Sequence, residues 1–128
     1  MRARLVTLRA RTDFLRVAAK GLRAAVPGLV LQAAPGPAGA AAVRVGFTAT
    51  RKLGGAVTRN RAKRRLRAAA AAVLAERGKP GMDYVLIARA GTVERPYPAL
   101  VADLETALRR VSRGARAERP AAAEKERA

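Results

Sequence analysis

The chain has 128 residues and a net charge of +18, from 27 Lys and Arg against 9 Asp and Glu. This length suits one small domain, and so large a positive charge is typical of proteins that bind nucleic acid. The chain has neither histidine nor cysteine, which excludes the commonest general base, disulfides and thiolate metal sites. No carboxylates are paired for two-carboxylate chemistry or metal binding, so we expect no conventional active site.

The hydrophobic pattern does not indicate a membrane protein. The longest apolar run, residues 68–74, is far shorter than the roughly 20 residues that cross a bilayer. The basic first residues are not followed by an apolar run of signal-peptide length. Since the absence of cysteine also suits a reducing compartment, we predict a cytoplasmic protein that does not associate with membranes.

The first predicted element is a short helix that Thr12 caps and Gly21 ends. Phe14, Val17 and Ala18 recur on one face of it at helical spacing. Two roles for Phe14 stay open: packing in the core, or stacking on a nucleic-acid base at the edge of a cleft.

Two strands are predicted next, at residues 29–31 and 43–50, with a turn rich in Pro and Gly between them. In the second strand apolar residues alternate with polar ones, which indicates a half-buried strand. Phe47 is in phase with the apolar residues and is predicted to pack in the core. Thr48 and Thr50 lie on the opposite face, where they either face solvent or contact a nucleic-acid backbone.

A loop containing Gly54–Gly55 leads into a long predicted helix, which Thr58 caps and which ends near Arg77. The predicted buried stripe consists of Ala62, Leu66, Ala69, Ala70 and Val73. The rest of the circumference carries the basic residues Arg61, Lys63, Arg64, Arg65 and Arg67.

A buried strand at 84–88 and an amphipathic helix at about 97–111 complete the predicted elements. The fold class is therefore α+β, in the order α-β-β-(β)-α-β-α, with helices on a small mixed sheet of three to four strands. We predict one RNA-binding domain at residues 1–112, followed by a disordered tail rich in basic residues and alanine at 113–128.

The distribution of charge is the most informative feature. Residues 43–67 contain nine Arg or Lys and no Asp or Glu. Arg59, Asn60 and Arg61 begin the long helix, where cations oppose the helix dipole and so need another partner. Phosphate is such a partner, because guanidinium groups bind its oxygens in pairs. The alternative is a basic helix face that is only solvated.

The segment GFTATRKLGGAVTRNRAKRRLR resembles the signature of the bacterial ribonuclease P protein component. TDFLRVAAKG, LVLQAA and DYVLIARA extend the resemblance over roughly residues 5 to 110. Arg51–Lys52 match a basic dipeptide of that family, and Arg59–Asn60–Arg61 match its Arg-Asn-Arg motif. Lys63, Arg64 and Arg67 match the basic positions that follow.

The resemblance implies the protein subunit of a ribonucleoprotein endonuclease that removes the 5′ leader of precursor tRNA. Its partners would be precursor tRNA and a catalytic RNA, with no obligate protein partner. The RNA would perform the hydrolysis with Mg²⁺, so no catalytic residue and no cofactor held by protein side chains alone are expected. The resemblance also implies a left-handed βαβ crossover, against the general preference.

The resemblance assigns two sets of binding residues. The RNA subunit would contact Arg59, Asn60, Arg61, Lys63, Arg64, Arg65 and Arg67. The leader would contact Phe14, Thr48, Thr50, Arg51 and Lys52. Ala18 and Gln32 stand where the family often has aromatics, and Gly55 stands where it usually has Asn. We therefore expect leader binding here to depend more on charge than on stacking.

Two other functions agree with the composition. A ribosomal protein would bind ribosomal RNA and remain with the particle. A DNA-architectural protein usually dimerises and inserts an apolar wedge, but the sequence shows no exposed arm for this.

Overall fold

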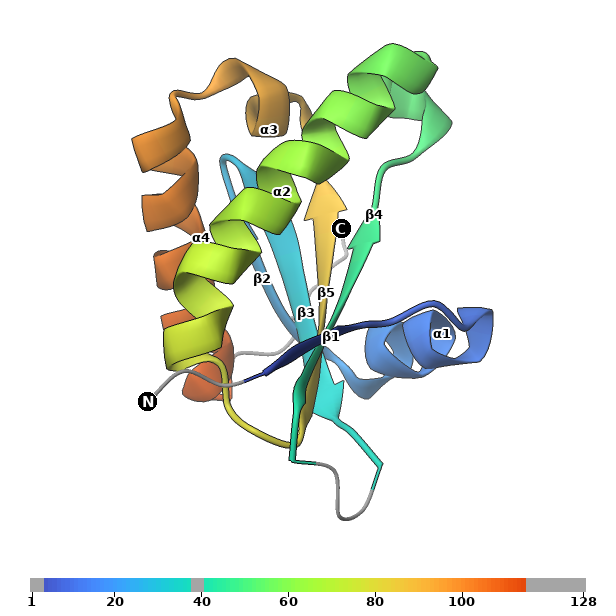
Figure 1. Ribbon diagram of the computed structural model, residues 1–128, viewed down its shortest axis with the longest axis vertical. Coiled ribbons are helices and arrows are strands. Elements are labelled where there is room, and N and C mark those ends of the chain that lie inside the picture. The colour runs from blue at the N-terminus through green and yellow to red at the C-terminus, as the bar shows by residue number, and fades with distance from the viewer. Residues whose placement is uncertain (1–3, 38–40, 115–128) are drawn as a thin grey trace.

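The computed structural model describes residues 4–37 and 41–114 (Figure 1). The strands in these ranges are β1 (Leu5–Thr7), β2 (Leu22–Val26), β3 (Leu29–Pro35), β4 (Val43–Thr48) and β5 (Met82–Ala88). The α-helices there are α1 (Arg11–Lys20), α2 (Ala56–Arg77), α3 (Ala90–Glu94) and α4 (Tyr97–Ser112). A short 3₁₀ turn, η1 (Arg51–Leu53), joins β4 to α2.

The strands form one mixed sheet in the order β1-β4-β5-β3-β2. β4 runs parallel to both β1 and β5, whereas β3 runs antiparallel to β5 and β2. The predicted α+β class with helices packed on a mixed sheet is confirmed. The sheet has five strands where three to four were predicted. β1 and β2 were not predicted because they are short and lack a strong alternating pattern of large apolar residues.

The connection from β4 through α2 to β5 is a left-handed crossover, as the resemblance implied. In Figure 1 both strands point upward, β4 lies to the right of β5 and α2 crosses in front of them. Such connections are nearly always right-handed, so the sequence pattern alone does not predict this one. The crossover places the first turns of α2 above the upper end of β4.

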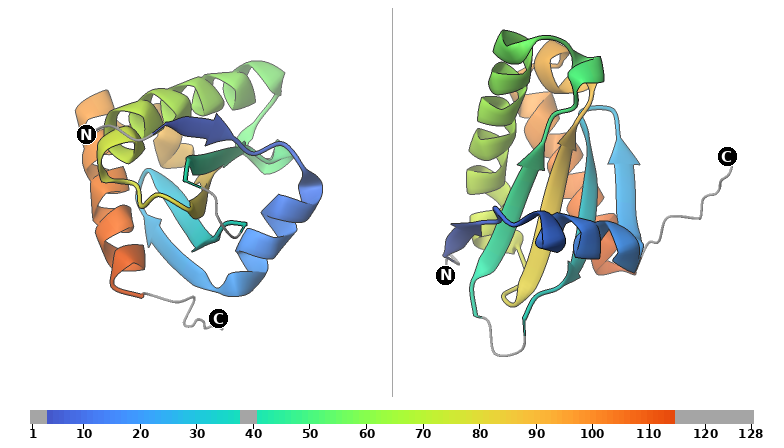
Figure 2. Two further views of the ribbon diagram at one scale, coloured as in Figure 1. Left: turned by 60° about the horizontal axis from the view of Figure 1, so that its bottom comes forward. Right: turned by 90° about the vertical axis from the view of Figure 1, so that its right-hand side faces the viewer.

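The main core lies between the sheet and the pair α2 and α4 (Figure 2). Leu66 of α2, Leu86 of β5 and Leu104 of α4 are fully buried there. All five residues of the buried stripe predicted for the long helix are buried, which confirms its orientation. Phe47 packs against this core as predicted, but its side chain also remains partly accessible to solvent.

A second, smaller cluster lies on the opposite face of the sheet, beneath α1. It consists of Leu8, Val17, Ala34 and Val85, with Phe14 and Ile87 packed against it. Since α1 covers only part of this face, side chains at its border remain accessible.

Two predicted helix caps are wrong. α1 begins at Arg11 after Ala10, so Thr12 lies inside the helix. α2 begins at Ala56 after Gly55, which places Thr58 in its first turn. The predicted ends of both helices are confirmed. Gly21 ends α1 with a φ of 86°, a left-handed conformation that favours glycine.

The missed strand β2 belongs to a tight hairpin. Val26 pairs with Leu29, so Pro27 and Gly28 form a two-residue turn. A Cβ at Gly28 would lie 2.6 Å from Oδ2 of Asp103, so this turn packs closely on α4. Most of the predicted disordered tail, from residue 115 onward, lies outside the described residues. None of the helices in the described ranges is long and apolar enough to cross a membrane.

Candidate nucleic-acid interface

Two arginines of the basic sequence are neutralised inside the fold. Asp83 of β5, only 1% exposed, accepts hydrogen bonds from Arg44 Nε at 2.8 Å and Arg44 Nη2 at 2.7 Å. Arg16 of α1 also donates to Asp83 and bonds the carbonyl of Pro35 at 2.6 Å. Asp13 Oδ1 lies 3.3 Å from Arg44 Nη2 and completes the cluster. Arg16 and Arg44 thus anchor α1 to the sheet.

The cluster changes the acidity of its members. Burial of Asp83 opposes its ionisation, but the hydrogen bonds from Arg44 and Arg16 outweigh burial and lower the pKa of this carboxyl. The hydrogen bond from Arg44 to Asp83 in turn raises the pKa of Arg44. Both groups are therefore ionised at neutral pH, and their charges largely cancel.

Arg65 is also occupied within the fold. Its Nε donates to the Thr92 carbonyl at 2.7 Å, and its Nη2 donates to the Arg95 carbonyl. These bonds tie α2 to α3 and to the connection between α3 and α4. Arg65 was predicted to contact the RNA subunit, but two of its guanidinium nitrogens are taken up by these carbonyls.

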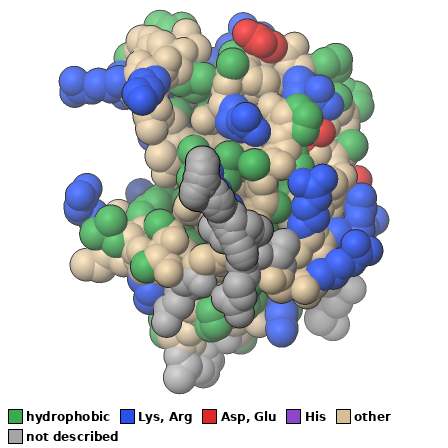
Figure 3. All heavy atoms as spheres, turned by 180° about the vertical axis from the view of Figure 1, so that it is seen from behind, with side chains coloured by type: hydrophobic (Ala, Val, Ile, Leu, Met, Phe, Trp, Pro, Cys, Tyr) green, Lys and Arg blue, Asp and Glu red, His purple; other side chains and the backbone are tan. Residues whose placement is uncertain are grey.

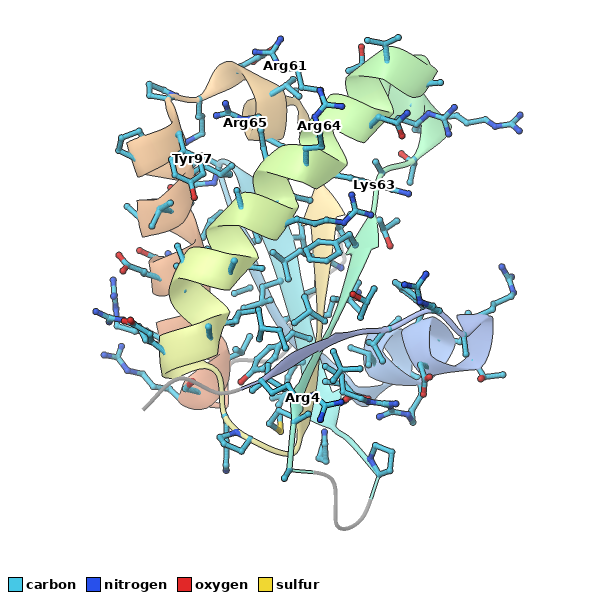
Figure 4. The ribbon with its side chains drawn as sticks, viewed as in Figure 1. Arg4, Arg61, Lys63, Arg64, Arg65 and Tyr97 are labelled. Atoms are coloured by element: carbon cyan, nitrogen blue, oxygen red, sulfur yellow. The ribbon has the colours of Figure 1, made fainter. Side chains whose placement is uncertain are left out.

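The remaining polar residues of the predicted RNA-subunit set are distributed around the first half of α2 (Figure 4). Asn60, Arg61 and Arg64 are exposed. Arg59 is half-buried, and its Nε is enclosed without a hydrogen-bond partner. Arg67 is exposed, with its guanidinium carbon 5.4 Å from the centre of the Phe47 ring. This distance is within the range of a cation–π contact.

An open cleft of about 410 Å³ lies where α1, β4 and α2 meet. Its lining residues are Arg11, Phe14, Phe47, Thr48, Ala49 and Lys63. In Figure 3, seen from behind, the left edge of the molecule is hollowed between α1 below and the start of α2 above, and basic side chains flank the hollow. The cleft therefore combines two aromatic rings, a hydroxyl and two cations.

The structure places Phe14 between the two environments left open by the sequence. It packs against the cluster beneath α1, yet it remains half-exposed and lines the cleft. The glycine at position 46 makes this packing fit, because a Cβ there would lie 2.6 Å from two ring carbons of Phe14. Gly46 is not among the residues predicted for the site, although a glycine inside a strand often marks close approach of another group.

The structure divides the leader set predicted from the resemblance. Phe14 and Thr48 line the cleft, whereas Thr50, Arg51 and Lys52 are exposed at the adjoining end of β4 and in η1. Lys63, which was predicted to contact the RNA subunit, lines the cleft instead. Arg11, which was not predicted for either set, lines it as well.

The three departures from the family pattern lie around this region. Ala18 is exposed on α1, and Gln32 is half-buried on β3 beside Val85, which belongs to the cluster beneath α1. Gly55 precedes α2, and a Cβ there would meet no atom within 4 Å. The Asn that is usual at this position would thus fit without displacing a neighbour.

The described residues offer no evident metal centre. No group of three or more His, Cys, Asp or Glu gathers in residues 4–37 and 41–114. The buried carboxylate of Asp83 is already saturated by arginine donors.

Known proteins resemble this chain in sequence and in fold. The family model Ribonuclease P matches residues 3–112. The chain belongs to the ribonuclease P protein component family. It is 53% identical over 114 residues to the Ribonuclease P protein component of Paramagnetospirillum magneticum, which covers 87% of this chain and 86% of that protein. It is 51% identical over 106 residues to that of Ruegeria pomeroyi, covering 81% and 84%.

Solved ribonuclease P proteins share the fold. The protein from Staphylococcus aureus superposes with a TM-score of 0.67 and 25% identity, over 80% of this chain and 92% of that one. The protein from Thermotoga maritima has a TM-score of 0.67 and 28% identity, over 81% and 96%. Neither the ribosomal nor the DNA-architectural alternative finds support in these matches.

Proposed function

We propose that this ribonuclease P protein component binds the catalytic RNA through the outer face of α2 and the single-stranded 5′ leader of precursor tRNA in the cleft. One observation carries the proposal. Three cations of one helix make no side-chain hydrogen bond or ion pair with the described residues: Lys63 lines the cleft, whereas Arg61 and Arg64 are exposed outside its lining. One helix then stands between two RNA strands.

The cleft suits an unpaired strand better than a duplex. Phe14 offers an accessible ring to a base, and such stacking needs a base that is not already stacked between its neighbours in a helix. Lys63 and Arg11 border the ring and are available for phosphates, while Thr48 offers a hydroxyl. Arg51 and Lys52 extend the positive charge beyond the cleft, so a leader strand of several nucleotides stays near cations.

The outer face of α2 suits a folded RNA backbone. Arg61 and Arg64 are exposed, and each guanidinium is free to bind two phosphate oxygens. Gly54 and Gly55 precede the helix, whose first backbone amides and dipole also favour anions. Asn60 lies between the basic residues and offers a donor and an acceptor to a base edge or ribose.

The protein's role is to bind and to orient. It has no histidine or cysteine, and its described residues contain no group of three or more candidate metal ligands. We infer that Mg²⁺ enters with the RNA subunit, which would supply the hydrolytic chemistry. The protein would raise the affinity for precursor tRNA and keep its leader extended away from the mature tRNA body.

Reconstitution tests this proposal. The purified chain, the ribonuclease P RNA of the same organism and a precursor tRNA with a labelled 5′ end are combined in Mg²⁺ at moderate salt. Cleavage at the mature 5′ end is expected with RNA and protein together, and no cleavage is expected with the protein alone. Metal-dependent cleavage by RNA-free protein, or failure of the protein to bind this RNA, would contradict the proposal.

A further inference from the structure

Tyr97 is the aromatic residue whose place in the molecule remains unexplained. Phe14 and Phe47 line the cleft. Tyr84 is buried in the core, and its hydroxyl accepts a hydrogen bond from the Lys79 backbone amide at 3.0 Å. Tyr97, at the start of α4, is 38% exposed, and its hydroxyl makes no hydrogen bond with the residues that the structure describes. A single exposed ring is ordinary on a protein surface, so exposure alone does not make a site.

The backbone that carries Tyr97 is fixed by hydrogen bonds immediately before it. Arg65 reaches from α2 to the carbonyls of Thr92 and Arg95. The Thr92 hydroxyl, fully buried, bonds the Gly28 carbonyl, and Arg95 Nε lies 2.6 Å from Asp103 Oδ2. The segment that leads from α3 into α4 is thus held to α2, to the β2–β3 turn and to the body of α4. A ring held on such a braced segment loses little additional freedom when it binds a flat ligand.

Free cations lie beside this segment. Arg61 is one helical turn before Arg65 and shares its face of α2, since residues four apart are neighbours on a helix. Because Arg65 contacts the α3–α4 connection, Arg61 also faces α3. Arg64, three residues after Arg61, extends the row. Figure 4 shows these three arginines and Tyr97 around α3 and the start of α4. Arg61 and Arg64 are exposed, and neither makes an ion pair or side-chain hydrogen bond with another residue of 4–37 or 41–114.

We propose that Tyr97 is a stacking site for an unpaired base of the RNA that binds the outer face of α2. An exposed ring flanked by cations is the arrangement that binds single-stranded nucleic acid, because the cations hold the phosphates while the ring holds a base. The RNA-binding surface then extends from α2 across α3 to α4. In this arrangement Arg65 is a positioning residue: it does not contact RNA but holds the segment that precedes Tyr97 against α2.

This inference rests on the proposed function, since the base belongs to the RNA subunit. It differs in its physical signature from the phosphate contacts. Stacking is not electrostatic, so loss of the ring lowers affinity equally at all salt concentrations. Loss of a phosphate contact instead lowers the slope of log affinity against log salt by about 1.

The experiment titrates the full chain with the ribonuclease P RNA of the same organism over a range of salt. Tyr97→Leu is expected to bind about tenfold more weakly with an unchanged salt slope, and Tyr97→Phe is expected to bind as the wild type does. Arg61→Ala is the comparison that should change the slope. Thermal melts of each variant confirm that it is folded.

A direct readout comes from fluorescence, because the chain contains no tryptophan. The emission of Tyr97→Trp is expected to be quenched when the RNA binds. Ala102→Trp, at an exposed position on the same helix, is the control and should change little. Unquenched Tyr97→Trp, or Tyr97→Leu that binds as tightly as the wild type, overturns the inference while leaving the proposed function intact. Failure of the wild type itself to bind this RNA overturns both.

Discussion

The ring of Phe14 lies directly on the backbone of Gly46: a Cβ at position 46 would be 2.6 Å from both Cε1 and Cζ of the ring. The same added Cβ would lie 3.2 Å from Cβ of Leu8, so the space above position 46 is already filled. The glycine of β4 therefore sets the depth at which an aromatic side chain of α1 sits in the cleft. Gly46 therefore affects the proposed leader site through Phe14, although it has no side chain of its own.

Gly46→Ala is expected to displace Phe14 without unfolding the protein. The added methyl group forces the ring or α1 outward, which we expect to cost about 1–3 kcal/mol of stability. The preference for precursor over mature tRNA should fall with it. Chemical denaturation and binding of both tRNA forms to the reconstituted holoenzyme measure the two effects. An unchanged preference in the folded variant would separate the ring's position from leader binding.

Phe14→Leu separates the packing of this residue from its stacking. Leucine keeps much of the apolar contact with the cluster beneath α1 but has no flat face for a base. We therefore expect a small loss of stability and a clear loss of preference for precursor tRNA, since stacking contributes about 1–3 kcal/mol per base. Phe14→Ala should lose both properties. Retained preference in Phe14→Leu would show that the ring acts only by filling space.

Two neighbouring arginines of α2 are expected to behave differently. Arg64 is exposed, so Arg64→Ala should leave stability unchanged and lower the salt slope of binding to the RNA subunit by about 1. Arg65→Ala removes the donors to the Thr92 and Arg95 carbonyls and should cost about 1–3 kcal/mol of stability. Its salt slope should stay near that of the wild type. The two variants are each other's control, and a lowered slope for Arg65→Ala alone would reverse their assignments.

The parts of this fold that follow local periodicity could be predicted from the sequence. The buried stripe of α2 and the alternation of β4 repeat over enough residues to define a face. The central basic segment also indicated phosphate binding, because local sequence offers it no counter-charge. The short strands β1 and β2 could not be recognised in this way, since three to five residues rich in small side chains carry too little pattern.

Interactions between distant residues account for the remaining errors. Arg44 appears unpaired in the sequence, but its partner Asp83 lies 39 residues later and meets it only because β4 and β5 are adjacent. In the sequence, Arg65 cannot be told apart from the free basic residues around it on α2. Only the position of α3 shows that its donors are occupied. Likewise, Lys63 and Arg11 become neighbours of one cleft only when α1 and α2 are placed on the sheet.

The buried carboxylate of Asp83 should control stability at neutral pH. Asp83→Asn removes the negative charge that Arg16 and Arg44 share, leaving two guanidinium groups without it. Breaking a buried ion pair in this way typically costs about 3–5 kcal/mol. Since both arginines remain partly exposed, with side-chain exposures of 31% and 23%, water compensates for part of the loss. We therefore expect a cost of about 2–3 kcal/mol, measured by urea unfolding at pH 7.

The difference in stability between the wild type and Asp83→Asn should disappear in acid. The pKa of Asp83 is lowered in the folded state, so its ionised form stabilises the fold at every pH above the unfolded-state pKa of about 3.9. As the pH falls below that value and through the folded pKa, the unfolded chain takes up the proton first and the stabilisation disappears. The difference in unfolding free energy between wild type and Asp83→Asn should thus be constant from pH 7 to about 5 and shrink at lower pH. Glu105→Gln is the control, because Glu105 lies 3.9 Å from an exposed Arg77 and should contribute little at any pH. A difference that persists undiminished below the folded pKa, at constant ionic strength, would show that Asp83 stabilises α1 by packing and hydrogen bonding and not by its charge.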